Sequence, residues 1–263
     1  MKPPAQTALV TGASGGIGLE LARLLARDHH DLVLVARNSE RLGQISRELS
    51  IQFAVSVKTI ALDLSAASAP QFVFDQLQRE AVAVDILINN AAYGVFGEFA
   101  KVALEESLGQ IQLNLTALTH LTKLFVGPMI ERHAGRILNV ASTAGFQPGP
   151  LMAVYYATKA YVISFSEALA NELKSHGITV TCLCPGATDT AFQSRAGIEN
   201  TVLFRKLRPM SAKTVARDGY RGLMSGRTLV ISGWRNRLLA ESIRFAPRRL
   251  VTAISRKVLD EID

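Results

Sequence analysis

The chain has 263 residues, of which 48% are hydrophobic and 19% charged, a balance typical of a soluble globular protein and not of a disordered one. No apolar run reaches the roughly 18 residues that cross a bilayer, and the N-terminus lacks a signal-peptide pattern, so we expect a cytoplasmic protein. The net charge of +7 is uneven, because residues 1–194 hold 14 Lys and Arg against 16 Asp and Glu, whereas residues 195–263 hold 15 against 6.

Short apolar runs alternate with longer stretches of helical periodicity along the chain. Strands are expected at 7–11, 31–36, 57–61, 85–89, 135–142, 178–184 and 229–231. Helices are expected at 17–27, 39–49 (with Ser39 as its N-cap), from about 68, at 104–132 with an interruption near Gly127-Pro128, and at 153–175 and 212–224. This alternation predicts an α/β fold with one doubly wound parallel sheet of about seven strands, helices on both faces, and a single domain over residues 1–263.

The two cysteines, Cys182 and Cys184, lie on one expected strand. Residues two apart share a face at about 6.6 Å, which is poor geometry for a disulfide. No histidine is near enough in the sequence to suggest a metal site with them. We interpret both as reduced thiols that pack in the core, and we expect no metal.

A glycine-rich turn follows the first strand and opens the first helix. It has the spacing Gly12-x-x-x-Gly16-x-Gly18. The phosphates of a dinucleotide need close approach to backbone N–H groups and to the positive end of a helix. An ordinary strand–helix turn is the alternative interpretation, but the position before an amphipathic helix favours a nucleotide site.

The residue at the end of the second strand bears on the choice of nucleotide. A carboxylate at this place accepts hydrogen bonds from the adenosine ribose and favours NAD. This chain instead has Arg37, 19 residues after Gly18, and a guanidinium suits a 2′-phosphate. We therefore predict NADP(H) ahead of NAD(H), with a solvated surface arginine as the alternative.

A possible proton donor lies in the helix expected at 153–175. Tyr155 and Lys159 are four residues apart and share one helix face. A free tyrosine titrates near ~10, and a neighbouring ammonium would lower that pKa, so that the phenol could exchange a proton with a carbonyl or alcohol. Ser142 ends the fifth strand, at the edge where such sheets bind ligands. Tyr156, three residues from Lys159, is the alternative candidate for the proton donor. The alternative interpretation of Ser142 is a cap at the end of the strand.

These motifs together resemble the short-chain dehydrogenases/reductases over about residues 7–190. The resemblance implies a Rossmann-type fold, with Tyr155 as acid/base, Lys159 beside it, and Ser142 holding the substrate oxygen. It also implies that Asn114 organises a water leading to Lys159, where the alternative is a helix–helix hydrogen bond. Ala92 departs from the family, which has glycine at this position. The implied cofactor-binding residues are Gly12, Ser14, Gly16, Ile17, Gly18, Arg37, Asp63, Leu64, Asn90, Ala91, Tyr155, Lys159, Pro185, Gly186, Thr188 and Thr190.

The resemblance implies an NADP(H)-dependent oxidoreductase that moves a hydride between nicotinamide and a carbonyl or secondary alcohol, in a homodimer or homotetramer. One alternative is a non-catalytic NADP(H)-binding sensor or scaffold. Another is a sugar epimerase or dehydratase of the related extended family, which the glycine spacing disfavours. Residues 191–227 are expected to form a lid over an apolar substrate. The apolar residues expected near the substrate are Tyr93, Val95, Phe96, Phe146, Leu151, Met152, Phe192, Ile198, Val202, Leu203 and Phe204.

Residues 234–263 are expected to form a basic helical extension. Seven Lys and Arg and a single Glu lie between Trp234 and Val258, with apolar residues between them. Such helices pack against a protein, lie on an anionic membrane surface, or stay solvated. We rank packing or an oligomer contact first and peripheral membrane contact second. Nucleic-acid binding comes last because stacking aromatics are scarce there, and we expect no nucleic-acid partner.

Overall fold

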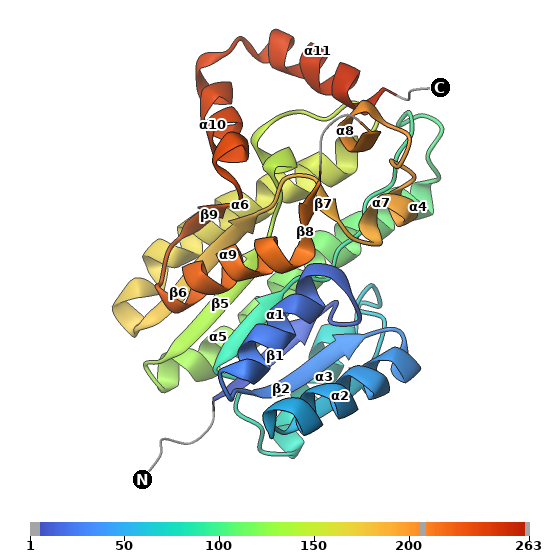
Figure 1. The fold of residues 1–263 in the computed structure, drawn as a ribbon. Coiled ribbons are helices and arrows are strands. Elements are labelled where there is room, and N and C mark those ends of the chain that lie inside the picture. Colours follow the sequence, from blue (N-terminus) through green and yellow to red (C-terminus); the bar gives the residue numbers. More distant parts are fainter. Residues whose placement is uncertain (1–5, 206–208, 261–263) are drawn as a thin grey trace.

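A seven-stranded parallel sheet forms the centre of the computed structural model, which describes residues 6–205 and 209–260 (Figure 1). The strand order is β3-β2-β1-β4-β5-β6-β9, and all neighbouring strands are parallel. The strands are β1 (Thr7–Thr11), β2 (Asp31–Ala36), β3 (Val57–Ala61), β4 (Ile86–Asn89), β5 (Gly135–Val140), β6 (Ile178–Cys184) and β9 (Leu229–Ile231). The predicted doubly wound α/β class is confirmed. Residues 206–208 of the expected lid and 261–263 of the expected extension lie outside the described residues.

Helices cover both faces of this sheet (Figure 1). One face carries α1 (Gly16–Arg27), α2 (Ser39–Phe53) and α9 (Ala212–Met224), and the other carries α3 (Ala69–Arg79), α5 (Leu118–Glu131) and α6 (Ala153–Glu172). In β2, Leu32 and Leu34 pack toward α1 and α2, whereas Val33 and Val35 pack toward the opposite layer. Successive side chains of a strand alternate between faces, so a continuous apolar run is what a strand buried on both sides requires.

The strand order reverses between β1 and β4. The chain builds β1, β2 and β3 toward one edge and then returns to place β4, β5 and β6 on the other side of β1. In sheets of this kind a crevice opens at the carboxyl ends of the strands at the point of reversal. The loops after β1 and β4 therefore lie where a ligand site is expected.

The helical region at 104–131 differs from the prediction. The expected interruption near Gly127-Pro128 is wrong, because α5 continues through Pro128 to Glu131. A proline removes one backbone donor, and this one lies in the last turn of the helix, where the loss disturbs little of the helix that follows. The irregularity lies earlier, where a π-helix at Gln112–Ala117 separates α4 (Leu104–Ile111) from α5. Such insertions often mark functional positions.

Other boundaries differ by a few residues. The N-cap of α2 is Asn38, whose side chain accepts a 2.8 Å hydrogen bond from the Arg41 backbone, and not Ser39. Strand β5 ends at Val140, two residues before Ser142. Helix α6 ends at Glu172, and a 3-10 turn then leads to Gly177, whose positive φ of 72° makes it the expected left-handed cap.

Short elements cover the carboxyl edge of the sheet. They are β7 (Thr188–Asp189), paired in parallel with β8 (Met210–Ser211), and the helices α7 (Phe192–Ala196), α8 (Val202–Arg205), α10 (Trp234–Ser242) and α11 (Arg248–Leu259). Helices α10 and α11 stand beyond the end of the sheet (Figure 1). Cys182 and Cys184 are free and buried, as expected. Among the helices of the described residues, none combines the length and apolarity that crossing a bilayer requires.

Candidate active site

One cavity of about 920 Å³ opens at the carboxyl edge of the sheet. Loops that follow β1 through β6 line it, together with residues of α6, α7, α8 and α11. Most of the residues predicted to bind the cofactor or to react line this cavity. They are Gly12, Ser14, Gly16, Ile17, Arg37, Asp63, Leu64, Asn90, Ala91, Ser142, Tyr155, Lys159, Pro185, Gly186, Thr188 and Thr190. Gly18 and Asn114 are not among the lining residues. The fold thus gathers predicted residues from Gly12 to Thr190 around one space.

The glycine turn has two separate structural requirements. Gly12 has a φ of 64°, which favours glycine. Gly18 is needed for packing, because a Cβ there would lie 2.5 Å from both the Asn90 Nδ2 and the Gly12 carbonyl oxygen. Helix α1 begins directly after Gly15 without a side-chain cap and without an acidic residue in its first turn. Its uncapped N–H groups and dipole therefore suit an anionic group in the cavity.

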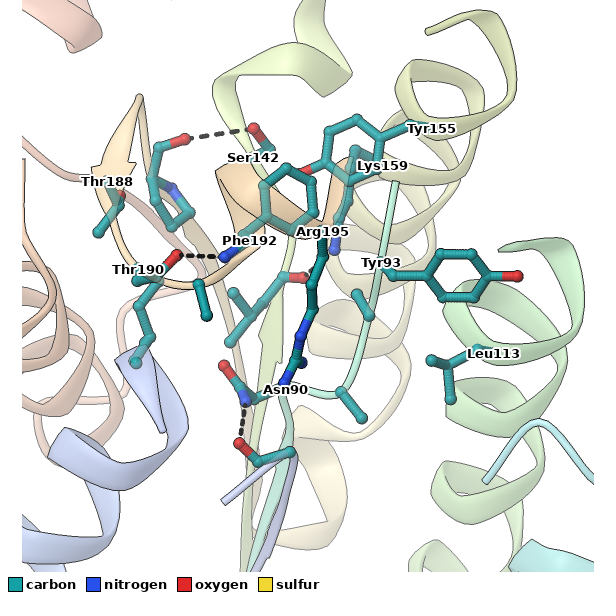
Figure 2. Close-up of a pocket in the computed structure, with 18 of the residues that line it drawn as sticks. Asn90, Tyr93, Leu113, Ser142, Tyr155, Lys159, Thr188, Thr190, Phe192 and Arg195 are labelled. Atoms are coloured by element: carbon teal, nitrogen blue, oxygen red, sulfur yellow. Dashed lines mark hydrogen bonds between the residues drawn. The ribbon is translucent and has the colours of Figure 1, made fainter. Parts of the chain in front are cut away.

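The turn is fastened to the loop after β4. The Thr11 hydroxyl donates to the Ile88 carbonyl at 3.2 Å and accepts from the backbone N–H groups of Asn90 and Ala91 at 2.9 and 3.0 Å. The Asn90 side chain donates to the carbonyls of Thr11 and Gly12 at 2.9 and 3.2 Å (Figure 2). These bonds hold the two loops at the reversal point in one arrangement. Ala92 lines the cavity, so the methyl group at this position is accommodated.

Arg37 lies on the cavity wall with its side chain 67% exposed. Its Nη1 is 3.9 Å from Oδ2 of Asp63. Burial opposes ionisation of Asp63, but hydrogen bonds from Ser65 and the charge of Arg37 hold the pKa of this carboxyl below its usual value. Asp63 also accepts from the Ser65 backbone and hydroxyl at 2.9 and 2.7 Å, so it caps its own turn. The guanidinium therefore keeps donors that can bind an anionic ligand.

Ser142, Tyr155 and Lys159 come together at one end of the cavity (Figure 2). Ser142 follows β5 and accepts from the Ala144 backbone at 3.1 Å while donating to the Pro185 carbonyl at 3.3 Å. Tyr155 and Lys159 occupy the first two turns of α6. The Lys159 ammonium donates to the Val140 carbonyl at 2.8 Å and lies 5.6 Å from the centroid of the Tyr155 ring.

Burial dominates the titration of this group. It raises the pKa of the Tyr155 hydroxyl well above its ordinary value, although a hydrogen bond with Ser142 opposes the rise. Burial lowers the pKa of Lys159 to about 8, with the nearby thiols of Cys182 and Cys184 acting in the other direction. The expected lowering of the Tyr155 pKa is therefore not found in this structure, because desolvation of the buried hydroxyl dominates. At neutral pH the phenol keeps its proton and is suited to act as an acid.

Tyr156 has a different environment from its neighbour. It is buried, and its hydroxyl lies near Ser255 of α11. Its ring meets that of Tyr155 edge to face at 6.2 Å between centroids. Because its hydroxyl is directed at the C-terminal helix, Tyr156 does not share the contacts of Tyr155 with Ser142 and Lys159.

Asn114 lies in the π-helix, behind the cavity wall. Its Nδ2 donates to the Tyr93 carbonyl at 2.9 Å and to the Thr158 hydroxyl at 3.1 Å, and its Oδ1 accepts from the Tyr93 backbone at 3.1 Å. The side chain thus joins the π-helix to α6 and to the segment after β4. The bond to Thr158 matches the alternative interpretation, in which Asn114 joins two helices. The water that the resemblance implies between Asn114 and Lys159 stays a prediction.

Apolar side chains form the part of the cavity wall next to Tyr155. The ring of Phe192 lies 5.1 Å from that of Tyr155, between centroids, and covers the Ser142 end of the site. Of the residues expected near the substrate, Tyr93, Met152, Phe192, Ile198, Leu203 and Phe204 line the cavity. Val95, Phe96, Phe146, Leu151 and Val202 do not.

The lining residues that the sequence analysis did not place in the site include Gln147, Arg195 and Val258. Arg195 extends from α7 into the cavity toward Asn90 (Figure 2). No pattern in the sequence predicted α7, so nothing indicated the direction of this side chain. Val258 could have been found, because Val251, Ser255 and Leu259 recur every four residues as a buried stripe beside it.

Comparison with known proteins places this geometry in context. The family model described as short chain dehydrogenase matches residues 6–200. A ketoacyl reductase, HetN, from Nostoc sp. is 33% identical over 229 residues, which is 86% of this chain and 78% of that protein. A very-long-chain 3-oxoacyl-CoA reductase from Pyrenophora tritici-repentis is 34% identical over 193 residues. That match covers 72% of this chain and 57% of the relative, so the chain spans little more than half of the relative's length.

A solved structure supports the same relationship. A short-chain dehydrogenase from Sphingobium yanoikuyae in complex with NADPH is 33% identical and superposes with a TM-score of 0.84. The superposition covers 93% of this chain and 94% of that one. The likeness therefore extends over the sheet, its helices and most of the carboxyl edge.

The packing role of Gly18 can be tested directly. Gly18→Ala is expected to destabilise the fold by roughly 1–3 kcal/mol, because the added methyl would press on Asn90 and the Gly12 carbonyl. Gly43→Ala in α2 is the matched control, since its Cβ would meet nothing within 4 Å. Urea unfolding of both variants measures the difference. Equal stability of the two variants would contradict the close packing of α1 on the loop after β4.

Proposed function

The chain belongs to the short-chain dehydrogenase family, and we propose that it uses NADPH to reduce the keto group of an apolar 3-oxoacyl thioester to a secondary alcohol. The observation that carries the proposal is the position of the Tyr155 hydroxyl. It lies in the cavity beside Ser142, near the buried ammonium of Lys159 and next to an apolar wall. A protonated acid at the border of a polar and an apolar space suits the reduction of a ketone.

The cavity fits a dinucleotide with a 2′-phosphate. The open, uncapped start of α1 suits the pyrophosphate, and the exposed guanidinium of Arg37 suits the 2′-phosphate. Pro185, Gly186, Thr188 and Thr190 line the side where the nicotinamide end would lie. When bound, the cofactor supplies the hydride. The NADPH bound to the Sphingobium protein supports the same choice of NADP(H) over NAD(H).

Residues of the chain orient the substrate and donate a proton to its carbonyl oxygen. Ser142 and Tyr155 present two hydroxyls to the substrate oxygen, and Tyr155 donates its proton to that oxygen as the carbonyl carbon is reduced. The phenolate that remains is stabilised by the Lys159 ammonium, which is held in place by the Val140 carbonyl. A proton from solvent then restores the phenol. Because burial raises the pKa of Tyr155, the acid is already protonated at neutral pH.

The substrate class follows from the apolar part of the cavity and from the relatives. Phe192, Ile198, Leu203 and Phe204 form a wall with Met152, and this wall continues to Val258 of α11. An acyl chain would bury its methylenes there, each contributing about 0.8 kcal/mol. The names of the Nostoc and Pyrenophora relatives, a ketoacyl and a 3-oxoacyl-CoA reductase, support a 3-oxoacyl group.

A non-catalytic sensor or scaffold is the alternative function. Such a protein needs the nucleotide cradle but has no use for an acid, a cation and a hydroxyl joined at the reacting end of the cavity. The presence of Ser142, Tyr155 and Lys159 on the wall of the same cavity therefore favours an enzyme.

The organisation of the protein is proposed on similar grounds. The whole chain forms one domain, in which residues 191–227 act as the lid and residues 234–263 as a basic extension. Exposed apolar side chains on α4 and α6, Leu104, Leu108, Ile111 and Tyr161, support a homodimer or homotetramer. A cytoplasmic location agrees with the absence of a membrane-spanning helix among residues 6–205 and 209–260.

The acid is tested by two neighbouring substitutions. Tyr155→Phe should lower turnover at least about 100-fold while NADPH binding stays nearly unchanged, because only the transferable proton is lost. Tyr156→Phe removes a hydroxyl that lies near Ser255, away from Ser142 and Lys159, and should change turnover only a few-fold. NADPH absorbance is followed with 3-oxoacyl thioesters of several chain lengths and with unrelated ketones. Wild-type turnover in Tyr155→Phe would refute the acid, and equal rates with all ketones would refute the substrate class.

Cofactor preference is tested at the wall that binds the adenosine end. Arg37→Asp should raise the KM for NADPH roughly 10- to 100-fold, because a carboxylate replaces a charge-assisted partner of the 2′-phosphate. The KM for NADH should not rise. Arg47→Asp, on the exposed side of α2, makes the same change of charge outside the cavity. If both variants show the same NADPH KM, Arg37 does not bind the phosphate.

The pH dependence of reduction depends on Lys159. Its pKa of about 8 means that the ammonium is charged below that pH and loses its charge above it, so the rate should be constant near neutral pH and fall above about pH 8. Lys159→Arg keeps its charge to high pH and should retain a larger fraction of its own neutral rate at about pH 9. Rates are compared within each protein. An equal fractional decline in both would show that another group titrates.

A further inference from the structure

The C-terminal cap, defined here as α10, the 3-10 turn Ile243–Phe245 and α11, carries an unusual number of exposed apolar side chains. Phe245 is 90% exposed and Trp234 is 72% exposed. The others with more than half of their surface exposed are Leu238, Leu239, Leu250 and Ile254. Large apolar side chains gathered on one part of a surface indicate a contact that the isolated chain does not make.

The two helices keep separate inner and outer faces. In α11 the buried stripe consists of Val251, Ser255 and Leu259, one turn apart from each other. Leu250 and Ile254 are also one turn apart, and both lie on the exposed side. In α10 only Ala240 is buried, whereas Trp234 and Leu238 share an exposed face. The exposed apolar groups are therefore not unfilled parts of the core, since the core contacts are made by the other faces.

The same outer surface is strongly basic. Two of its cations are paired, Arg237 with Glu241 at 2.9 Å and Arg256 with Asp260 at 3.1 Å. Within the described part of the chain, the remaining five form no ion pair: Arg235, Arg244, Arg248, Arg249 and Lys257. Arg235 lies over the Trp234 ring at 5.2 Å from its centroid, so a cation and an aromatic ring share one site.

We infer that the C-terminal cap is a docking surface for an anionic lipid bilayer. Unpaired cations attract acidic headgroups, and the effect is additive near a charged membrane. Exposed Leu, Ile and Phe side chains bury themselves at the boundary of headgroups and acyl chains, and Trp prefers this interface. Cationic and apolar side chains on the outer faces of two short helices are the combination that such a surface binds.

Charge also argues against a second copy of this chain as the occupant. A two-fold contact places the same patch on both subunits, so the five unpaired cations would face one another. Like charges that face each other across an interface cost several kcal/mol in other complexes, which makes the cap a poor surface for self-association. Nucleic acid would satisfy the cations but leave the leucines and the isoleucine without a partner.

The cap also forms part of the cavity wall. Val258 lines the cavity, Leu259 packs in the apolar cluster with Ile198 and Tyr156, and Ser255 lies near the Tyr156 hydroxyl. Docking would thus hold the apolar wall of the cavity close to the bilayer, from which an acyl substrate could enter. This last step rests on the proposed function, whereas docking itself does not.

Trp234, the single tryptophan in the sequence, makes the test direct. Phosphatidylcholine vesicles with and without phosphatidylglycerol are mixed with the full chain, and sedimentation and tryptophan emission are recorded at low and high salt. Anionic vesicles at low salt should sediment the protein, shift its emission to shorter wavelength and protect Trp234 from a water-soluble quencher. High salt should weaken binding several-fold. No binding to anionic vesicles at low salt would overturn the proposal.

Substitutions show whether vesicle binding depends on the C-terminal cap or only on the total charge and surface hydrophobicity of the protein. Arg248→Gln, Arg249→Gln and Lys257→Gln combined should weaken vesicle binding at least about tenfold. The combined control, Lys213→Gln, Arg217→Gln and Arg221→Gln on the exposed side of α9, removes equal charge and should weaken it much less. Phe245→Ser should weaken binding, whereas Ile51→Ser, at an 85% exposed site on α2, should not. Equal loss in cap and control variants would overturn the proposal.

Two further measurements distinguish lipid docking from self-association and keep the test of docking separate from the test of the proposed reaction. Sedimentation velocity without lipid shows whether Phe245→Ser changes the oligomeric state, and dissociation of a wild-type oligomer by this variant would mean that the cap binds a second copy instead. NADPH oxidation with a water-soluble ketone should be the same in all cap variants and in the wild type. Failure of an active wild-type protein to bind anionic vesicles would disprove docking without touching the proposed reaction, and vesicle binding by an inactive wild-type protein would disprove the reaction without touching docking.

Discussion

The Thr11 hydroxyl joins the two halves of the sheet at the point where the strand order reverses. It bonds with the Ile88 carbonyl and with two backbone N–H groups after β4, so β1 and β4 cannot separate or slide without losing all three contacts. Asn90 completes the connection by bonding back to the glycine turn. The crevice that a doubly wound sheet creates is thereby given a fixed floor, and the loops from the other strands converge above it.

A chain of buried polar groups holds the reacting residues at one end of this floor. Asn89 donates to Thr122 at 3.0 Å and to Asn139 at 2.9 Å, and Asn139 donates to Ser166 of α6 at 2.9 Å. These bonds connect β4, β5, α5 and α6 through the layer below Tyr155 and Lys159. Because α6 is fixed to the sheet, its first two turns present the phenol and the ammonium at a constant position, and their burial then sets the pKa of each.

The C-terminal residues link the site to the surface. The inner face of α11 closes the apolar end of the cavity, and its outer face carries cations and exposed aliphatic groups. The positive charge of the whole chain comes from this last quarter, so the part of the molecule that shapes the substrate space is also the part with the strongest attraction for anionic surfaces.

Much of the protein could be read from local sequence. Alternating apolar runs and helical periodicity predicted the strands and most helices, because burial on both faces of a parallel sheet requires continuous apolar strands such as 32–35. Spacing and position between a strand and a helix indicated the glycine turn, and the family resemblance selected Tyr155 over Tyr156 as the partner of Lys159. Other features were decided by contacts between distant segments, and short-range patterns do not encode these. They include the π-helix around Asn114, the entry of Arg195 into the cavity and the contribution of Val258 to its wall. The rise in the pKa of Tyr155 belongs with them, because desolvation depends on what the whole fold packs around the hydroxyl.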